Sequence, residues 1–180
     1  MNLWTVRHPP TETKGICVGQ HNVPLTISQK DACAQVLQSS PLTPNMIYSS
    51  DLPRCMNLAK LLGAHWGIPH RIDIRLREVS MGEWEGKSYD SLLEDPRWNP
   101  WCENWLVARP PGGESLSDLQ KRVQEWLCET QITDHTLLVS HAGVVRTLHR
   151  IAGLPWEEAM RRPVLHLKWQ SIFIETERLD

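Results

Sequence analysis

The sequence predicts a three-layer α/β/α protein, with a mostly parallel central sheet and a small helical cap. Short apolar stretches that fit buried strands alternate along the chain with stretches of helical periodicity, as in sheets built from crossover units. Residues 136–140 are almost wholly apolar, which is typical of a central strand covered on both faces. The chain has no internal repeat and a length that suits one domain over residues 1–180, with the cap inserted at about residues 80–113.

The first strand and the first helix are indicated by their boundary residues. An apolar strand over residues 3–6 must end at Pro9, which has no N–H to continue a sheet ladder. Residues 11–25 contain two glycines and are expected to form a loop that faces the ligand. Thr26 to Gln29 has the spacing of a capping box, so we expect a helix over residues 26–38.

A second strand is expected over residues 46–50, followed directly by another helix. Asp51 is a suitable N-cap, and Pro53 falls early in the helix, where proline is tolerated. Arg54 therefore lies in the first turn, beside the strand ends. Ile72 and Ile74 indicate a short third strand that leads to an arginine and a glutamate.

The expected cap lacks strand alternation and is rich in Trp, Gly and Pro. Two short helices are predicted near residues 88–95 and 98–107. Its tryptophans can form the cap's own core or a platform for a ligand, and burial makes the core the favoured interpretation. These tryptophans are Trp84, Trp98, Trp101 and Trp105.

The last third of the chain adds two helices and two strands. Ser115 to Asp118 resembles a capping box and is followed by apolar residues at helical spacing. The central strand over residues 136–140 runs into His141, after which a helix is expected as far as Gly153. A final strand is expected within residues 165–174.

Composition excludes several classes of function. The formal net charge is −2, so no basic excess points to a nucleic-acid partner. The five cysteines include no Cys-x-x-Cys pair, which argues against a zinc site and against a disulfide framework, and free thiols fit a reducing cytoplasm. No signal peptide and no apolar run of membrane-spanning length is apparent, so we expect a cytoplasmic protein without a membrane partner.

Charged and imidazole side chains follow four of the expected strands. They are Arg7 with His8, Arg54, Glu78 and His141. The carboxyl ends of parallel strands meet at one edge of a sheet, which is where open α/β sheets bind ligands. Two arginines and two histidines at this edge would form a cationic pocket suited to a phosphoryl group, and one carboxylate is available to move a proton.

The segments around these residues together resemble the histidine phosphatase superfamily, also called phosphoglycerate mutase-like. The resemblance spans residues 3–154, and the joint pattern is specific although each segment alone is weak. The segments are Val6-Arg7-His8, Ser49-Ser50-Asp51-Leu52-Pro53-Arg54, Leu76-Arg77-Glu78, Gly82-Glu83-Trp84-Glu85-Gly86, Pro111-Gly112-Gly113-Glu114-Ser115 and Val139-Ser140-His141-Ala142-Gly143-Val144.

The resemblance implies His8 as a nucleophile that forms a transient phosphohistidine. It implies Arg7, Arg54 and His141 as phosphate ligands and Glu78 as the proton donor to the leaving group, without a metal or a cofactor. Further candidates for substrate contact are Thr11, Gln20 and Glu85, with Glu83 as another auxiliary acid. In place of the small residue that usually follows the histidine, this chain has Pro9.

The expected activity is hydrolysis of a small phosphorylated metabolite. The short chain and the segment from Trp101 to Trp105 most resemble α-ribazole phosphatases of cobalamin synthesis. A broad-specificity phosphatase and a phosphoglycerate mutase remain open. An inactive phosphate-binding scaffold is a further alternative. The presence of His8 and Glu78 argues against it, because binding alone does not require both a nucleophile and an acid. A monomer and a homodimer are both compatible with the sequence. The histidines without motif context are expected at the surface or in ordinary packing: His21, His65, His70, His135, His149 and His166.

Overall fold

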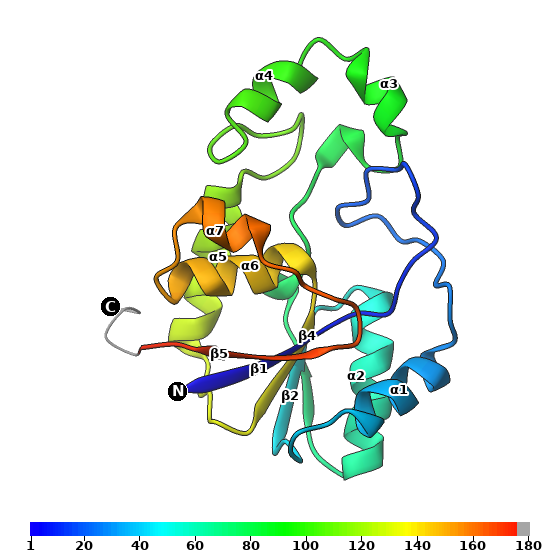
Figure 1. The fold of residues 1–180 in the computed structure, drawn as a ribbon, viewed down its shortest axis with the longest axis vertical. Coiled ribbons are helices and arrows are strands. Elements are labelled where there is room, and N and C mark those ends of the chain that lie inside the picture. The colour runs from blue at the N-terminus through cyan, green and yellow to red at the C-terminus, as the bar shows by residue number, and fades with distance from the viewer. Residues whose placement is uncertain (176–180) are drawn as a thin grey trace.

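The computed structural model describes residues 1–175 and contains a five-stranded sheet in the order β3-β2-β4-β1-β5 (Figure 1). Four strands are parallel, and β5 pairs antiparallel with β1. The α/β class with a mostly parallel sheet is confirmed. The strands are β1 (Asn2–Arg7), β2 (Met46–Ser49), β3 (His70–Ile72), β4 (Thr136–Ser140) and β5 (Trp169–Phe173).

Helices cover both faces of the sheet (Figure 1). Helices α1 and α2 lie on one side, and α5 and α6 lie on the other. The short helices α3 and α4 stand apart from the sheet, above the carboxyl ends of its strands. The α-helices are α1 (Gln29–Gln38), α2 (Pro53–Trp66), α3 (Tyr89–Leu93), α4 (Trp98–Glu103), α5 (Leu116–Glu129), α6 (Ala142–Ile151) and α7 (Trp156–Arg161), and the 3-10 helices are η1 (Ile74–Leu76) and η2 (Gly82–Trp84).

Each face of the sheet has its own hydrophobic core. On the α5 and α6 face, Trp126 is fully buried and meets Tyr48 edge to face, with ring centroids 5.6 Å apart. On the α1 and α2 face, Leu58 and Leu62 are fully buried against strand residues such as Val139. Because the central strand β4 is buried along its whole length, its carboxyl end is held rigidly where the site begins.

Two helix starts differ from the prediction. The N-cap of α1 is Ser28, whose hydroxyl accepts a hydrogen bond from the backbone N–H of Asp31, so the capping box expected at Thr26 is wrong by two residues. The N-cap of α2 is Leu52 without a side-chain cap. Asp51 instead accepts a hydrogen bond from Arg77 Nε at 2.7 Å, because an ion pair stabilises its carboxylate more strongly than backbone amides do.

The edges of the sheet also differ from the prediction. Strand β3 ends at Ile72, and Ile74 belongs to η1 with 66% of its surface exposed, because an edge position leaves no apolar layer to bury it. The last strand is confined to residues 169–173, and α7 precedes it. Helix α7 has six residues, and an amphipathic pattern of this length cannot be distinguished from a loop in the sequence.

The cap segment (residues 80–113) has a small core of its own. Trp84 is fully buried, and the rings of Trp98 and Trp101 lie 5.1 and 5.5 Å from it. Asp95 accepts a hydrogen bond from the Trp84 indole N–H, which fixes the ring. The cap helices are shorter than expected because Pro96 restricts the backbone between them and α4 ends at Glu103.

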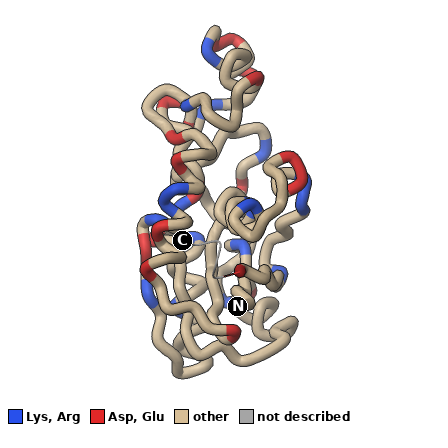
Figure 2. The backbone as a smooth tube through the Cα atoms, turned by 90° about the vertical axis from the view of Figure 1, so that its left-hand side faces the viewer, with Lys and Arg blue, Asp and Glu red and all other residues tan. Residues whose placement is uncertain are grey.

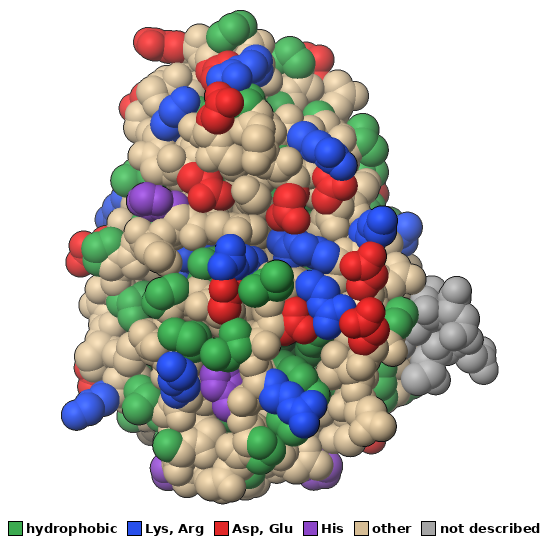
Figure 3. Space-filling view, turned by 180° about the vertical axis from the view of Figure 1, so that it is seen from behind, with side chains coloured by type: hydrophobic (Ala, Val, Ile, Leu, Met, Phe, Trp, Pro, Cys, Tyr) green, Lys and Arg blue, Asp and Glu red, His purple; other side chains and the backbone are tan. Residues whose placement is uncertain are grey.

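Positive and negative side chains are interspersed over the molecule (Figures 2 and 3). On the face seen in Figure 3, Lys and Arg alternate with Asp and Glu and build no broad patch of one sign. Among the described residues, ion pairs join Arg75 to Glu129 and Arg97 to Glu83. Part of the charge of the molecule is therefore paired locally.

Candidate active site

A cavity of about 520 Å³ lies at the carboxyl end of β1 and is lined in part by residues of the cap segment. Arg7, His8, Arg54 and Glu78 all line it. These four residues come from β1 and its exit, from the first turn of α2 and from the segment after η1. Four of the five catalytic candidates that the sequence indicates thus line one cavity.

His8 presents one ring nitrogen for chemistry. Its Nδ1 lies 2.7 Å from the backbone carbonyl oxygen of Pro9, and since a carbonyl only accepts, Nδ1 carries the proton. In the neutral ring, Nε2 therefore keeps its lone pair. Burial and the neighbouring guanidinium of Arg54 lower the pKa of His8 well below its ordinary value, which favours this neutral, nucleophilic form.

Two guanidinium groups supply the positive charge of the cavity. Arg54 donates from Nη1 to the His21 carbonyl at 2.9 Å and from Nη2 to the Gly19 carbonyl at 2.8 Å, which fastens the loop over residues 11–25 to α2. Arg7 donates from Nη1 to the Val164 carbonyl at 2.8 Å. Each guanidinium has five N–H donors, so both keep donors for an anionic ligand.

His141 lies behind the cavity wall and is fully buried. Arg54 Nε donates to its Nδ1 at 3.3 Å, so Nε2 carries the proton and donates to Ser50 Oγ at 3.0 Å. Its ring centroid is 5.1 Å from that of His8. Burial and the nearby His8 lower the pKa of His141 well below its ordinary value. In this arrangement His141 orients Arg54 and packs on His8; it does not line the cavity.

The carboxylate of Glu78 lies at the N-terminus of α6. Its Oε2 accepts from the backbone N–H of Gly143 at 3.2 Å, and its Oε1 accepts from the backbone N–H of Val79 at 3.0 Å. A Cβ atom at position 143 would stand 2.1 Å from Glu78 Oε1. A glycine is therefore required there for the carboxylate to approach the helix so closely.

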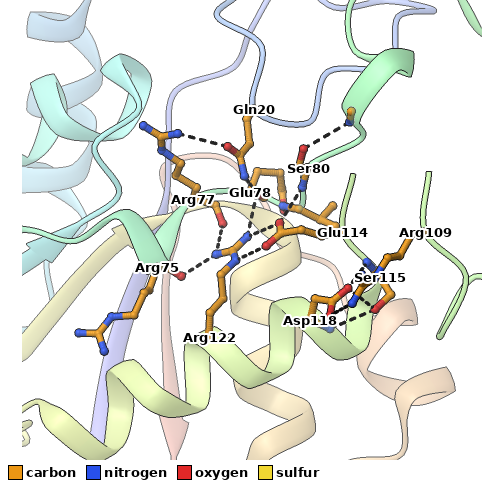
Figure 4. A network of polar contacts seen from close by, with 12 residues as sticks. Gln20, Arg75, Arg77, Glu78, Ser80, Arg109, Glu114, Ser115, Asp118 and Arg122 are labelled. Atoms are coloured by element: carbon orange, nitrogen blue, oxygen red, sulfur yellow. Dashed lines mark hydrogen bonds and ion pairs between the residues drawn. The ribbon is translucent and has the colours of Figure 1, made fainter. Parts of the chain in front are cut away.

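The backbone of Glu78 is held from below by Arg122 (Figure 4). Arg122 donates to the backbone carbonyls of Arg75, Arg77 and Glu78 and forms an ion pair with Glu114. Gln20 Nε2 also donates to the Glu78 carbonyl, at 3.0 Å. The position of the acid in the cavity is thus fixed through both its main chain and its side chain.

The three candidates for substrate contact fall into two groups. Thr11 lines the cavity. Gln20 and Glu85 do not line it: Glu85 Oε1 accepts from the backbone N–H groups of Gln20 and Met81, at 2.9 Å each. Glu83, the further auxiliary acid, pairs with Arg97 at the surface. Gln20 and Glu85 therefore shape the loop and the backbone around Glu78 rather than the cavity itself.

Aromatic side chains from the cap form the wall opposite the charged groups. Tyr89, Trp98 and Trp101 line the cavity, while the fully buried Trp84 supports them from inside the cap. Trp101 and Val79 also line a neighbouring apolar cavity of about 180 Å³ that extends toward Trp105. Trp84 thus forms the core of the cap, as the sequence favours, while Trp98 and Trp101 also line the cavity.

Sequence reasoning missed residues that reach the site from distant segments. His166 packs edge to face against His8, with ring centroids 5.1 Å apart, and Arg122 holds Glu78 from α5. Neither His166 nor Arg122 lies in one of the segments that carry the family resemblance. The sequence of α5 shows a mixture of polar and apolar residues, and this pattern does not reveal which backbone carbonyls Arg122 contacts.

No group of three His, Cys, Asp or Glu side chains within residues 1–175 is arranged to hold a metal ion. Likewise, none of the helices in that part of the chain is both long and apolar enough to span a bilayer. The charged and imidazole side chains that line the cavity are those of Arg7, Arg54, His8 and Glu78.

Acidification below about pH 6.5 is expected to destabilise the fold. Burial lowers the pKa of His8 and His141 from the ordinary value of 6.5, so the unfolded chain binds protons that the native state excludes. Stability is therefore complete above pH 6.5 and falls as the pH decreases, by about 1.4 kcal/mol per pH unit for each such histidine. Urea unfolding at pH 7.5 and 5.5 measures this, and equal free energies of unfolding would contradict it.

Comparison with known proteins gives a consistent picture. The chain matches the model of the histidine phosphatase superfamily, branch 1, over residues 3–179. It is 29% identical, over 97% of its length and 90% of the relative's, to the adenosylcobalamin/alpha-ribazole phosphatase of Escherichia coli strain K12. It is 34% identical, over 90% of its length and 80% of the relative's, to a probable phosphoglycerate mutase of Salmonella choleraesuis.

A solved structure extends the similarity to the fold. The crystal structure of the alpha-ribazole phosphatase from Shigella flexneri is similar with a TM-score of 0.85 and 26% sequence identity. The match covers 98% of this chain and 92% of that one, so it includes the sheet, its helices and the cap segment.

Proposed function

The chain belongs to the histidine phosphatase superfamily and is a phosphomonoesterase of that family; we propose that it hydrolyses α-ribazole 5′-phosphate or the corresponding cobalamin 5′-phosphate. The observation that carries this proposal is one cavity in which Arg7, His8, Arg54 and Glu78 face three aromatic rings of the cap. The charged side fits a phosphoryl group, and the aromatic side fits a planar, weakly polar leaving group.

In the first step, His8 Nε2 attacks the phosphorus atom. A bond forms between nitrogen and phosphorus while the ester P–O bond breaks, and its electron pair goes to the leaving oxygen. Glu78 gives that oxygen its proton. Arg7 and Arg54 stabilise the charge on the equatorial oxygens, which is the main catalytic requirement of phosphoryl transfer. His141 contributes by orienting Arg54 Nε, and direct contact with the phosphoryl group requires its ring to leave Ser50.

In the second step, a water molecule attacks the phosphohistidine. The N–P bond breaks and its electron pair returns to Nε2 of His8, while the Glu78 carboxylate takes a proton from the water. The products are inorganic phosphate and the free enzyme. Pro9 suits this cycle. The Nδ1–H of His8 donates to the Pro9 carbonyl, and the proline ring restricts the backbone that carries this carbonyl. The His8 ring is therefore held with Nε2 free to react.

The leaving group is selected by the uncharged side of the cavity. Of the described residues that line it, Arg7 and Arg54 are the cationic ones, and both are assigned to the phosphoryl group. The carboxylate of 3-phosphoglycerate would find no further cation there. A heteroaromatic ring that stacks on Trp98 or Trp101 gains about 1–3 kcal/mol, and the apolar cavity beyond Val79 leaves room for it.

The cellular setting is part of the same proposal. Cys17, Cys33, Cys55 and Cys102 are free thiols, which supports a reducing cytoplasm. The enzyme would act there as a monomer or a homodimer. Size-exclusion chromatography with light scattering decides between these two states.

A substrate panel tests the assignment. We expect kcat/KM for α-ribazole 5′-phosphate to exceed that for 3-phosphoglycerate, nucleoside monophosphates and sugar phosphates. A tenfold advantage of any of these over α-ribazole 5′-phosphate, about 1.4 kcal/mol of transition-state binding, would refute the substrate while leaving the phosphatase activity intact. Detecting inorganic phosphate rather than an isomerised phosphoester separates hydrolysis from mutase activity.

A further inference from the structure

The segment Val164–Leu167 crosses the exit of β1 and contacts both residues that begin the active site. The Val164 carbonyl accepts from Arg7 Nη1 at 2.8 Å, and the Leu167 backbone N–H donates to the Arg7 carbonyl at 3.0 Å. Between them, the His166 ring reaches the backbone of His8. This segment is separated from Arg7 and His8 by more than 150 residues of sequence, so tertiary folding alone creates the contact.

His166 holds the main chain of His8 directly. Its Nδ1 lies 2.7 Å from the His8 carbonyl oxygen and must donate to it, since a carbonyl only accepts. The two rings also meet edge to face at a centroid distance of 5.1 Å. His8 is otherwise fixed by its N–H to the Ser140 carbonyl at 3.0 Å and by Nδ1 to Pro9. Without His166, the His8 carbonyl loses this hydrogen bond and the His8 ring loses one of its packing contacts.

The backbone next to His166 has an unusual conformation. Leu167 has a φ of 60° while its side chain is buried, and it is the non-glycine residue with positive φ in the described part of the chain. Residues without a local reason for this conformation adopt it only when the surrounding structure imposes it. Here the conformation turns the chain so that the Leu167 N–H reaches Arg7 while the adjacent His166 ring reaches His8.

We propose that His166 is a positioning residue for phosphohistidine formation, acting by its Nδ1–H bond to the His8 carbonyl. The inference rests on the proposed role of His8 as nucleophile. His166 does not line the cavity, so it acts through His8 and not on the substrate. Its removal should slow formation of the phosphohistidine and leave substrate binding unchanged.

The test uses three substitutions that differ in where they place an N–H. Asparagine carries its amide nitrogen the same number of bonds from Cα as histidine Nδ1, whereas glutamine carries it one bond further, like Nε2. We therefore expect His166→Asn to stay within about threefold of the wild-type rate. His166→Gln and His166→Ala should lower kcat by about 10–100-fold with little change in KM, because displacement of a reacting group reduces the rate by such factors.

Rapid quench with p-nitrophenyl phosphate measures the phosphohistidine directly and does not depend on the natural substrate. Thermal melts verify that each variant is folded. The inference is overturned if His166→Gln forms phosphohistidine as fast as wild type, or if His166→Asn is as slow as His166→Gln. Absence of any phosphohistidine in the wild-type enzyme would instead refute the proposed function, so the two failures are distinguishable.

Discussion

The substitution His8→Ala should abolish turnover and remove the covalent intermediate. Wild-type enzyme that is exposed briefly to a 32P-labelled phosphomonoester should carry an acid-labile, base-stable label on His8. The variant should show no such label, and its kcat should fall by more than about a thousandfold, because the arginines alone bind and polarise the phosphoryl group without providing a nucleophile.

A matched control separates this effect from general damage. His65 is an exposed histidine near the end of α2, and His65→Ala should leave rate and label unchanged. His8→Ala should also remain folded, because its neighbours His141 and His166 keep their own hydrogen bonds to Ser50 and to the main chain of residue 8. Turnover by His8→Ala at the wild-type rate would exclude the phosphohistidine mechanism.

The substitution Glu78→Gln should produce the second largest loss, and the loss should depend on the leaving group. An alkoxide needs a proton as the ester bond breaks, and a positioned acid contributes about 10²–10⁴-fold to the rate. Hydrolysis of alkyl phosphates should slow by a factor in this range. Hydrolysis of p-nitrophenyl phosphate should slow much less, because nitrophenolate leaves without a proton.

Gly143→Ala gives an independent measure of the same group without changing any charge. The added Cβ would collide with Glu78 Oε1, and the flexible carboxylate can move aside while the helix stays intact. We expect the same dependence on leaving group with a smaller loss of rate.

Equal losses of Glu78→Gln on alkyl and nitrophenyl phosphates would make Glu78 a structural residue and leave the acid to be found elsewhere.

The class of the fold and most of its elements were predictable from local patterns. The apolar stretch of β4 and the capping box of α5 are formed by neighbouring residues, so their physical causes can be read in a short window. The same holds for Arg7, His8 and Arg54, because each stands directly at the end of a strand or in the first turn of a helix. Parallel strands then bring such ends to one edge.

Edge elements were predicted less well. The hydrophobicity of Ile74 predicts a strand, yet this residue is exposed in η1. The position of Asp51 predicts a helix cap, yet it pairs with Arg77, which lies 26 positions further along the chain. In both cases the local sequence pattern is present, but residues outside it determine the structure. Arg77 pairs with Asp51, and no apolar layer covers Ile74.

The charged groups and the strand ends that carry them follow from local sequence, because backbone propensity and apolar periodicity act over a few residues. The orientation of those groups depends on how distant segments pack. This packing places His141 behind Arg54, Glu78 against the amide of Gly143, and Arg122 and His166 on backbone carbonyls. Hydrogen bonds to carbonyls far along the chain depend on three-dimensional packing, and no spacing of residue types encodes them.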